Sequence, residues 1–166
     1  MMGKRGAIAA LAVVAGAGLS VAMAGRAETA GVSVERGRYI TIIAGCNDCH
    51  TEGYAKSGGT LPPTAWLKGD PVGHQGPWGT TYAVNLRLYL RDVSEDEWVA
   101  RVRAMKTRPT MPWFNMRVME EADVRSLYRF IRSLPGDAGP PMPDYVAPGD
   151  RPTTPVTVHV PQPPQP

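Results

Sequence analysis

Apolar side chains recur at helical spacing in three parts of the chain, and this pattern predicts three main helices. The first helix begins near Val34 and runs to Cys46. The second follows Ser94, which forms a capping box with Glu97, and extends to about Met105. The apolar positions are Val34, Tyr39, Ile40, Ile42 and Ile43 in the first segment, and Trp98, Val102 and Met105 in the second.

A third helix is predicted from Glu120 and Glu121, where acidic side chains suit the positive end of the helix dipole. Met119, at the expected N-cap position, is a poor capping residue. The helix stops at Pro135, because a proline followed by a glycine ends a helix. Its apolar positions are Val124, Leu127, Tyr128, Ile131 and Leu134.

The segments between and after these helices have the composition of loops. Residues 51–80 are rich in Gly, Pro and Thr, and so long a loop is unusual in a compact domain unless something other than secondary structure organises it. From Pro135 onward, 11 of 32 residues are proline, which predicts an extended tail, either loose or draped over the domain. The pattern predicts an all-α domain of three to four helices over residues 34–136, after a short lead-in at 25–33 and before the tail at 137–166.

The first 24 residues have the composition of a secretory signal peptide. Lys4 and Arg5 precede an apolar, uncharged run at 6–24, which ends in the small-residue pattern Ala22-Met23-Ala24. An uncleaved membrane anchor is the alternative, because the run is nearly long enough to span a bilayer. We therefore expect export to the periplasm, with membrane attachment only if the signal peptide is retained.

The charge balance argues against one class of partner. The chain has 18 Lys and Arg against 15 Asp and Glu, and cleavage after Ala24 removes two basic residues and no acidic one. The remaining Lys and Arg are scattered among the acids without a basic run. The sequence therefore does not indicate nucleic-acid binding.

Both cysteines of the chain lie in the motif Cys46-Asn47-Asp48-Cys49-His50. A Cys-x-x-Cys-His motif has a specific chemical use, the covalent attachment of haem c. Two thiols three residues apart on a helical turn project to the same side, so each can add across one vinyl group of the porphyrin. His50 then follows beneath the iron and supplies its first axial nitrogen.

Other uses of the motif are less well supported. A disulfide would close a very small loop and stabilise the fold little. A thioredoxin-type dithiol belongs in a βαβ context, whereas helices flank this motif. A zinc site needs four ligands, and only His74 and His159 remain beyond His50. One covalently bound haem c is therefore the predicted cofactor.

The second axial ligand of the iron is predicted to be Met111. Met111 precedes Pro112, follows a helix and a short turn, and lies far enough beyond His50 for the chain to pass around the ring to its opposite face. Met116 is the main rival, and His74 is the chief candidate that is not a methionine. The remaining methionines are expected in the core (Met105, Met119) or in the tail (Met142).

The chain resembles the class I c-type cytochromes of the bacterial periplasmic, mono-haem kind. The resemblance covers about 33–136 and rests on the signal peptide, the haem motif and four further stretches. These are Gly37-Arg38-Tyr39-Ile40, Gly76-Pro77-Trp78-Gly79-Thr80-Thr81-Tyr82-Ala83-Val84-Asn85-Leu86, and Met111-Pro112-Trp113-Phe114 with the later Leu127-Tyr128-Arg129-Phe130-Ile131.

This resemblance implies a cytochrome c fold wrapped around one covalently bound haem, with His50 and Met111 as iron ligands. It also implies a crossing of the first and last helices at Gly37 and Tyr128. Trp78, Tyr82 or Asn85 would pack near the haem propionates, ordinary core aromatics being the alternative for the two rings. No proline carbonyl aligns clearly as a partner for the His50 ring, with Pro62 or Pro63 as candidates.

The predicted function is the transfer of single electrons between redox proteins, without enzymatic activity. The expected partners are a donor dehydrogenase and an acceptor cytochrome or oxidase. One alternative is a cytochrome subunit docked on a periplasmic dehydrogenase, with the Pro-rich tail as its clasp. Another is a haem c enzyme with an open distal side, for which His74 is the ready candidate base.

Overall fold

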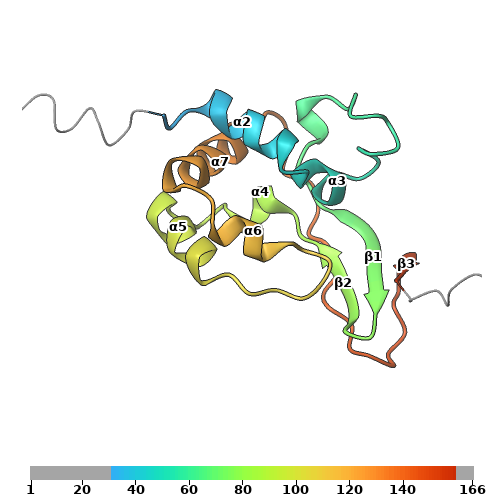
Figure 1. Cartoon of the computed structure of the whole chain (residues 1–166). Helices are drawn as coiled ribbons and strands as arrows, with labels where there is room; N and C mark the ends of the chain where they lie inside the picture. Colours follow the sequence, from blue (N-terminus) through green and yellow to red (C-terminus); the bar gives the residue numbers. More distant parts are fainter. Residues whose placement is uncertain (1–30, 160–166) are drawn as a thin grey trace, which may run out of the picture. The chain divides into compact units, whose positions relative to one another are not determined.

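The computed structural model describes residues 31–159; the predicted signal peptide and residues 25–30 of the lead-in lie outside this range. The elements are α2 (Val34–Ile43), α3 (Cys46–His50), η1 (Pro63–Ala65), β1 (Asp70–Gly76), β2 (Gly79–Ala83), α4 (Leu86–Tyr89), α5 (Glu95–Ala104), α6 (Trp113–Arg117), α7 (Glu121–Ser133) and β3 (Val156–Val158) (Figure 1). None of the helices described between residues 31 and 159 is both long enough and apolar enough to cross a bilayer.

The three main helices predicted from the apolar pattern are confirmed. The hydroxyl of Ser33 caps α2 by accepting a hydrogen bond from the Arg36 amide at 3.0 Å. The Ser94 hydroxyl caps α5 in the same way, accepting from the Glu97 amide at 3.2 Å. α7 lacks a side-chain cap, and its N-cap is Glu120 rather than Met119.

Helices α2 and α7 cross at Gly37, as the resemblance implied. A Cβ atom at Gly37 would collide with the carbonyl oxygen of Ser126 and lie 2.6 Å from Cβ of Phe130. Glycine is therefore required by the close approach of the two backbones. The aromatic partner was expected to be Tyr128, but Tyr128 is directed elsewhere and donates its hydroxyl to the Val93 carbonyl at 2.8 Å. Phe130, two residues farther along α7, contacts the crossing instead.

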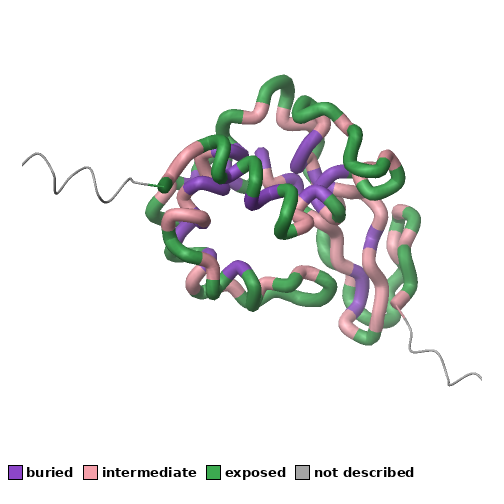
Figure 2. The backbone as a smooth tube through the Cα atoms, turned by 45° about the horizontal axis from the view of Figure 1, so that its top comes forward, coloured by how far each residue is buried: buried purple, intermediate pink, exposed green. Residues whose placement is uncertain are grey.

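The apolar core lies around α7, which packs against both α2 and α5, and it extends to the segment before β1 (Figure 2). Among the predicted positions of α2 only Ile40 is buried, whereas Ile42 and Ile43 are exposed. The buried apolar residues are Ile40, Trp66, Leu67, Leu90, Val93, Trp98, Val99, Val102, Met116, Val124, Leu127, Phe130 and Ile131.

The prediction of an all-α fold is wrong, because the chain contains a three-stranded sheet. β1 and β2 form an antiparallel hairpin with Pro77 and Trp78 as its turn, and β3 pairs with β1 in parallel, so the strand order is β2-β1-β3. The architecture is mixed, with a helical part and a small sheet beside it (Figure 1).

The hairpin was not predicted because its sequence is rich in Gly and Pro, which is typical of loops. Gly73 lies in the centre of β1, and a Cβ atom there would lie 2.5 Å from Cγ2 of Thr80 and 2.9 Å from Cε1 of Tyr82. The glycine thus accommodates side chains of the neighbouring strand, although glycine alone disfavours strands. Cross-strand packing overrides the local preference for loop.

The remainder of the predicted 51–80 loop is organised by the protein's own core. Trp66 is 3% exposed and Leu67 is fully buried. The Leu67 amide donates to the Thr51 hydroxyl at 2.7 Å, and the Trp66 indole donates to the Leu61 carbonyl at 2.8 Å. A bound cofactor is therefore not needed to explain the order of this segment.

Arg87 ties this loop to the beginning of the tail. Its side chain is buried, and its guanidinium donates to five backbone carbonyls and to no carboxylate. The acceptors are Trp66 at 2.7 Å, Pro63 at 2.7 Å, Thr64 at 3.2 Å, Pro135 at 2.8 Å and Asp137 at 3.2 Å. Burial lowers the pKa of Arg87, but the planar guanidinium remains the best fit to such a fan of carbonyls.

The tail is draped over the domain, which is one of the two predicted arrangements. Val146 exchanges two backbone hydrogen bonds with Thr80 of β2, at 2.8 and 3.0 Å. Farther along, β3 adds to the opposite edge of the hairpin, beside β1. The described part of the tail therefore contacts both edges of the hairpin.

Candidate functional site

The haem-type motif lies on the short helix α3, directly after α2. Gly45 separates the two helices and has a left-handed backbone (φ +66°), a conformation that glycine adopts without strain. His50 is the last residue of α3, and its carbonyl accepts a hydrogen bond from the Gly69 amide at 2.7 Å. The turn at Gly45 before the histidine and the hydrogen bond from Gly69 after it therefore both fix the backbone position of His50.

The His50 ring has one nitrogen engaged and one available. The ring is buried, with 8% exposure, and Nδ1 lies 2.7 Å from the carbonyl oxygen of Val84. Because a carbonyl only accepts, Nδ1 carries the hydrogen and the lone pair of the neutral ring is on Nε2. Burial lowers the pKa of His50, opposed by the bond to Val84, so the neutral form that can ligate iron is favoured.

The carbonyl partner of His50 was expected at Pro62 or Pro63, and this expectation is wrong. Val84 follows β2, so the position of its carbonyl is set by the hairpin. A sequence pattern without the hairpin could not have identified it. The hydrogen bond nevertheless has the form that is usual for metal-ligating histidines, in which a backbone oxygen fixes the tautomer and orientation of the ring.

The two thiols of the motif are not joined in a disulfide. Burial raises the pKa of the Cys46 thiol to about 11, and burial together with Asp48 raises that of Cys49. A reactive dithiol has lowered thiol pKa values, because the thiolate is the nucleophile. The environment of these cysteines is therefore the opposite of that in a thioredoxin-type site.

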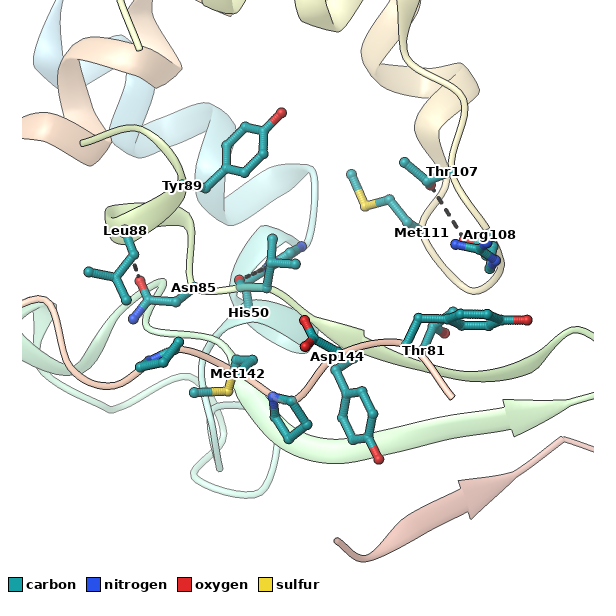
Figure 3. A pocket seen from close by; sticks show the side chains of 15 residues that line it. His50, Thr81, Asn85, Leu88, Tyr89, Thr107, Arg108, Met111, Met142 and Asp144 are labelled. Atoms are coloured by element: carbon teal, nitrogen blue, oxygen red, sulfur yellow. Dashed lines mark hydrogen bonds between the residues drawn. The ribbon is translucent and has the colours of Figure 1, made fainter. Parts of the chain in front are cut away.

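A cavity of about 560 Å³ adjoins His50 (Figure 3). Its volume is in the range of cofactor and ligand sites. Four other parts of the chain supply the walls: β2 and the residues after it, α4, the loop between α5 and α6, and the tail. The lining residues are His50, Thr81, Tyr82, Val84, Asn85, Leu88, Tyr89, Thr107, Arg108, Met111, Pro141, Met142, Pro143, Asp144 and Tyr145.

Met111 lines the same cavity from the loop between α5 and α6, across from His50 in Figure 3. This loop is attached to the hairpin, because the Thr81 hydroxyl donates to the Pro109 carbonyl at 2.6 Å. The structure thus brings together an imidazole and a thioether that are 61 positions apart in the sequence. Both belong to the predicted site.

Met142 is a second thioether at the cavity, and the sequence offered no reason to place it there. It packs against Gly69, where a Cβ atom would lie 2.9 Å from the Met142 sulfur. Since the Gly69 amide bonds the His50 carbonyl, Met142 rests against the backbone on the His50 side. Met111 instead reaches the cavity from the loop between α5 and α6, so the two methionines belong to different walls.

The other rival ligands lie outside the cavity lining. Met116 is buried in the core, and Met105 and Met119 pack against it, as expected of core methionines. His74 lies on β1, and its Nδ1 is 3.0 Å from Nε2 of His159. Neither histidine lines the cavity.

Two of the three residues expected near the propionates line the cavity, Tyr82 and Asn85. Trp78 instead forms the hairpin turn and lies near His159, with ring centroids 6.1 Å apart. Asn85 caps α4 through the Leu88 amide, and its amide group donates to the carbonyls of Ala138 and Pro140 at 2.7 and 2.9 Å. Asn85 therefore fastens the tail beside the cavity.

The tail wall was not foreseen. Pro141 to Tyr145 line the cavity, and the Arg108 guanidinium stands over the Tyr145 ring at 3.7 Å from its centroid. A proline-rich composition predicts an extended chain but not the surface on which the chain lies. Only the contacts of this segment reveal that it belongs to the site.

Within the described range, no three side chains of His, Cys, Asp or Glu come together in a way that would hold a metal ion. Comparisons with protein-family models, curated proteins and solved structures find no match to this chain.

The residues present fit a haem c in their chemistry. The buried ring of His50 has a free Nε2, two unpaired thiols precede it in the motif, and the thioether of Met111 faces the same cavity. Imidazole and thioether are the ligand pair of electron-transfer haems. The cavity walls are mostly apolar, as burial of a porphyrin requires.

Proposed function

We propose that this protein is a periplasmic mono-haem c-type cytochrome that carries single electrons between redox proteins. The observation that carries the proposal is the cavity lined by both His50 and Met111. The two unpaired thiols precede His50 on the same short helix α3, although neither thiol lines the cavity. A haem held there supplies an iron that gains and loses one electron. Cys46 and Cys49 would bind its porphyrin covalently, and His50 and Met111 would ligate its iron.

The other residues of the site support this role by position. The Val84 carbonyl holds His50 in the tautomer that offers Nε2. Met111 offers a soft sulfur, which favours ferrous iron and so raises the reduction potential. Tyr82, Tyr89 and the tail wall line the cavity, and burial of a haem ring there would also disfavour the extra charge of ferric haem.

Met111 is preferred over Met142 as the second ligand for a geometric reason. Met142 rests against Gly69 on the same side of the cavity as His50, whereas Met111 comes from the loop on the far side. Met111 would therefore hold the iron together with His50, and Met142 would form part of the wall.

The experiment begins with the full-length chain matured in a host that attaches haem c. We expect one covalent haem by mass analysis and the weak sulfur-to-iron band of a methionine-ligated ferric haem. Met111→Ala should remove this band and lower the reduction potential. Met142→Ala, the matched control in the same cavity, should retain the band.

Two results would decide against the proposal at different levels. If the purified chain has only the mass of the polypeptide, it carries no covalent haem and the proposed function is refuted. A haem-bearing Met111→Ala variant with an unchanged band would leave the cytochrome but discard Met111 as ligand, and loss of the band in Met142→Ala would point to that residue.

The expected partners remain a donor dehydrogenase and an acceptor cytochrome or oxidase. The tail as a free clasp for a dehydrogenase is less well supported, because its described part is bound to the protein's own hairpin. A haem c enzyme using His74 as distal base is also less well supported, since His74 does not line the cavity.

A further inference from the structure

Residues 137–159, here called the C-terminal strap, connect the cavity to the sheet. Asn85 holds the beginning of the strap, and residues 141–145 form a cavity wall. Val146 then pairs with one edge of the hairpin and β3 with the other. Detachment of the strap from the hairpin would therefore also displace the cavity wall that residues 141–145 form.

The end of the strap is joined to β1 by a pair of histidines. Nε2 of His159 lies 3.0 Å from Nδ1 of His74, and the ring centroids are 5.3 Å apart. The His159 amide also donates to the Gln75 carbonyl at 2.7 Å, which sets the ring beside β1. The 3.0 Å between the two ring nitrogens is the distance of a hydrogen bond between two imidazoles.

Such a bond depends on the protonation of the pair. One ring nitrogen must donate and the other must accept, so at least one ring has to be neutral. When both rings are protonated, both facing nitrogens are donors and both rings carry positive charge. The contact then becomes repulsive at hydrogen-bond distance.

The surroundings of the pair determine how strongly acid acts on it. Burial and the neighbouring His159 lower the pKa of His74, and the charge of Asp70 on the same strand opposes them. β2 contributes Tyr82, whose hydroxyl accepts a bond from Thr154, and the turn contributes the neutral Trp78 ring. Asp70 is therefore the acidic group that favours a charged His74, and it does not reverse the shift.

We propose that the His74–His159 hydrogen bond is a pH-sensitive latch, which holds the C-terminal strap on the hairpin at neutral pH and releases the strap and its cavity wall in acid. The latch uses no residue of the proposed ligand set. It does not depend on the presence of a cofactor and can be tested separately from the proposed function.

The size of the effect follows from proton linkage. A detached histidine has a pKa of about 6.5, while the latched pair excludes the second proton. Acid therefore favours the detached state. Between about pH 7.5 and about pH 5.5 the equilibrium constant for detachment should rise about tenfold if one proton is excluded.

Hydrogen exchange measured by mass spectrometry on the full chain tests the latch. Exchange rates of strap peptides are divided by the intrinsic rate of each amide, because the intrinsic rate itself changes with pH. We expect protection of the strap amides that pair with the hairpin, at Val146 and at 156–159, to fall about tenfold between about pH 7.5 and about pH 5.5. Peptides from α7 serve as the internal reference and should keep their protection.

His159→Gln is the decisive variant, since glutamine retains a hydrogen-bonding group and cannot take a proton. Its strap should show the same protection at both pH values. His74→Gln is the reciprocal variant and carries the same expectation if the first variant folds poorly. A wild-type strap without pH dependence, or an undiminished dependence in both variants, would overturn the latch. Loss of protection at 156–159 alone, with protection of the Val146 amide beside the cavity wall unchanged, would overturn its link to the cavity wall.

Discussion

Replacement of Arg87 by lysine tests whether one buried guanidinium holds the loop before β1, α4 and the strap together. The five acceptors of Arg87 are backbone carbonyls from 63–66 and 135–137. Lysine preserves the positive charge and the long aliphatic stem. The substitution therefore isolates the geometry of the guanidinium from its charge.

The magnitude follows from counting donors. An ammonium group has three hydrogens, so at least two of the five carbonyls lose their partner in Arg87→Lys. Each lost bond in a buried setting costs about 1–1.5 kcal/mol, and the compact ammonium is also more costly to bury. We expect a loss of about 2–4 kcal/mol in the free energy of unfolding.

The assay is urea unfolding of the full-length protein followed by tryptophan fluorescence, because the Trp66 carbonyl accepts a hydrogen bond from the Arg87 guanidinium. Arg91→Lys is the matched control, since Arg91 is exposed and nearby in the chain. Exposed substitutions of this kind change stability by about 0.5 kcal/mol or less.

An Arg87→Lys variant within about 0.5 kcal/mol of wild type, at unchanged m-value, would refute the reasoning. It would mean that the five carbonyls find water or other donors without loss. Equal destabilisation by Arg91→Lys would likewise show that the fork geometry of Arg87 is not the cause.

Two further predictions concern the helices. Gly37→Ala should destabilise the protein by about 2 kcal/mol or more. The added Cβ meets the Ser126 backbone oxygen, so overpacking lies at the upper end of about 1–3 kcal/mol, and helix propensity returns only about 1 kcal/mol. Thermal unfolding measures the loss, with Ile43→Ala on the exposed face as the control, and equal stability of Gly37→Ala and wild type would contradict the close crossing. Glu95 has a lowered pKa, chiefly through its bond to Arg129. Glu95→Gln should therefore cost about 1 kcal/mol at neutral pH. The cost should disappear as the pH falls from about 4.3, the unfolded value, through the lowered folded value. A cost that is the same at pH 7 and in acid would show that the ion pair is not responsible.

The sequence alone determined the features that depend on neighbours within a turn or two. Ser94 caps α5 as predicted, and the apolar positions Val124, Leu127 and Ile131 are buried on α7. The spacing of the two cysteines and His50 also identified the candidate ligand before any fold was known. Helical periodicity and capping act locally, so they can be recognised in the chain itself.

Only the tertiary structure decided what depends on segments far apart. The hairpin forms because Gly73 admits the side chains of Thr80 and Tyr82, which no local propensity reveals. At the crossing of α2 and α7, Gly37 faces Phe130, whereas Tyr128 is bonded to the Val93 carbonyl. The hydrogen-bond partner of the His50 ring is likewise set by the tertiary structure, because the end of β2 fixes the position of the Val84 carbonyl.

The cavity shows this division most clearly. His50 and Met111 were predicted from the sequence, but Met142, Arg108 and the tail wall were not. A proline-rich segment can lie on any surface that offers hydrogen-bond partners, and its composition does not specify which. Asn85 and the two edges of the hairpin provide these partners, and they exist only once distant parts of the chain have packed together.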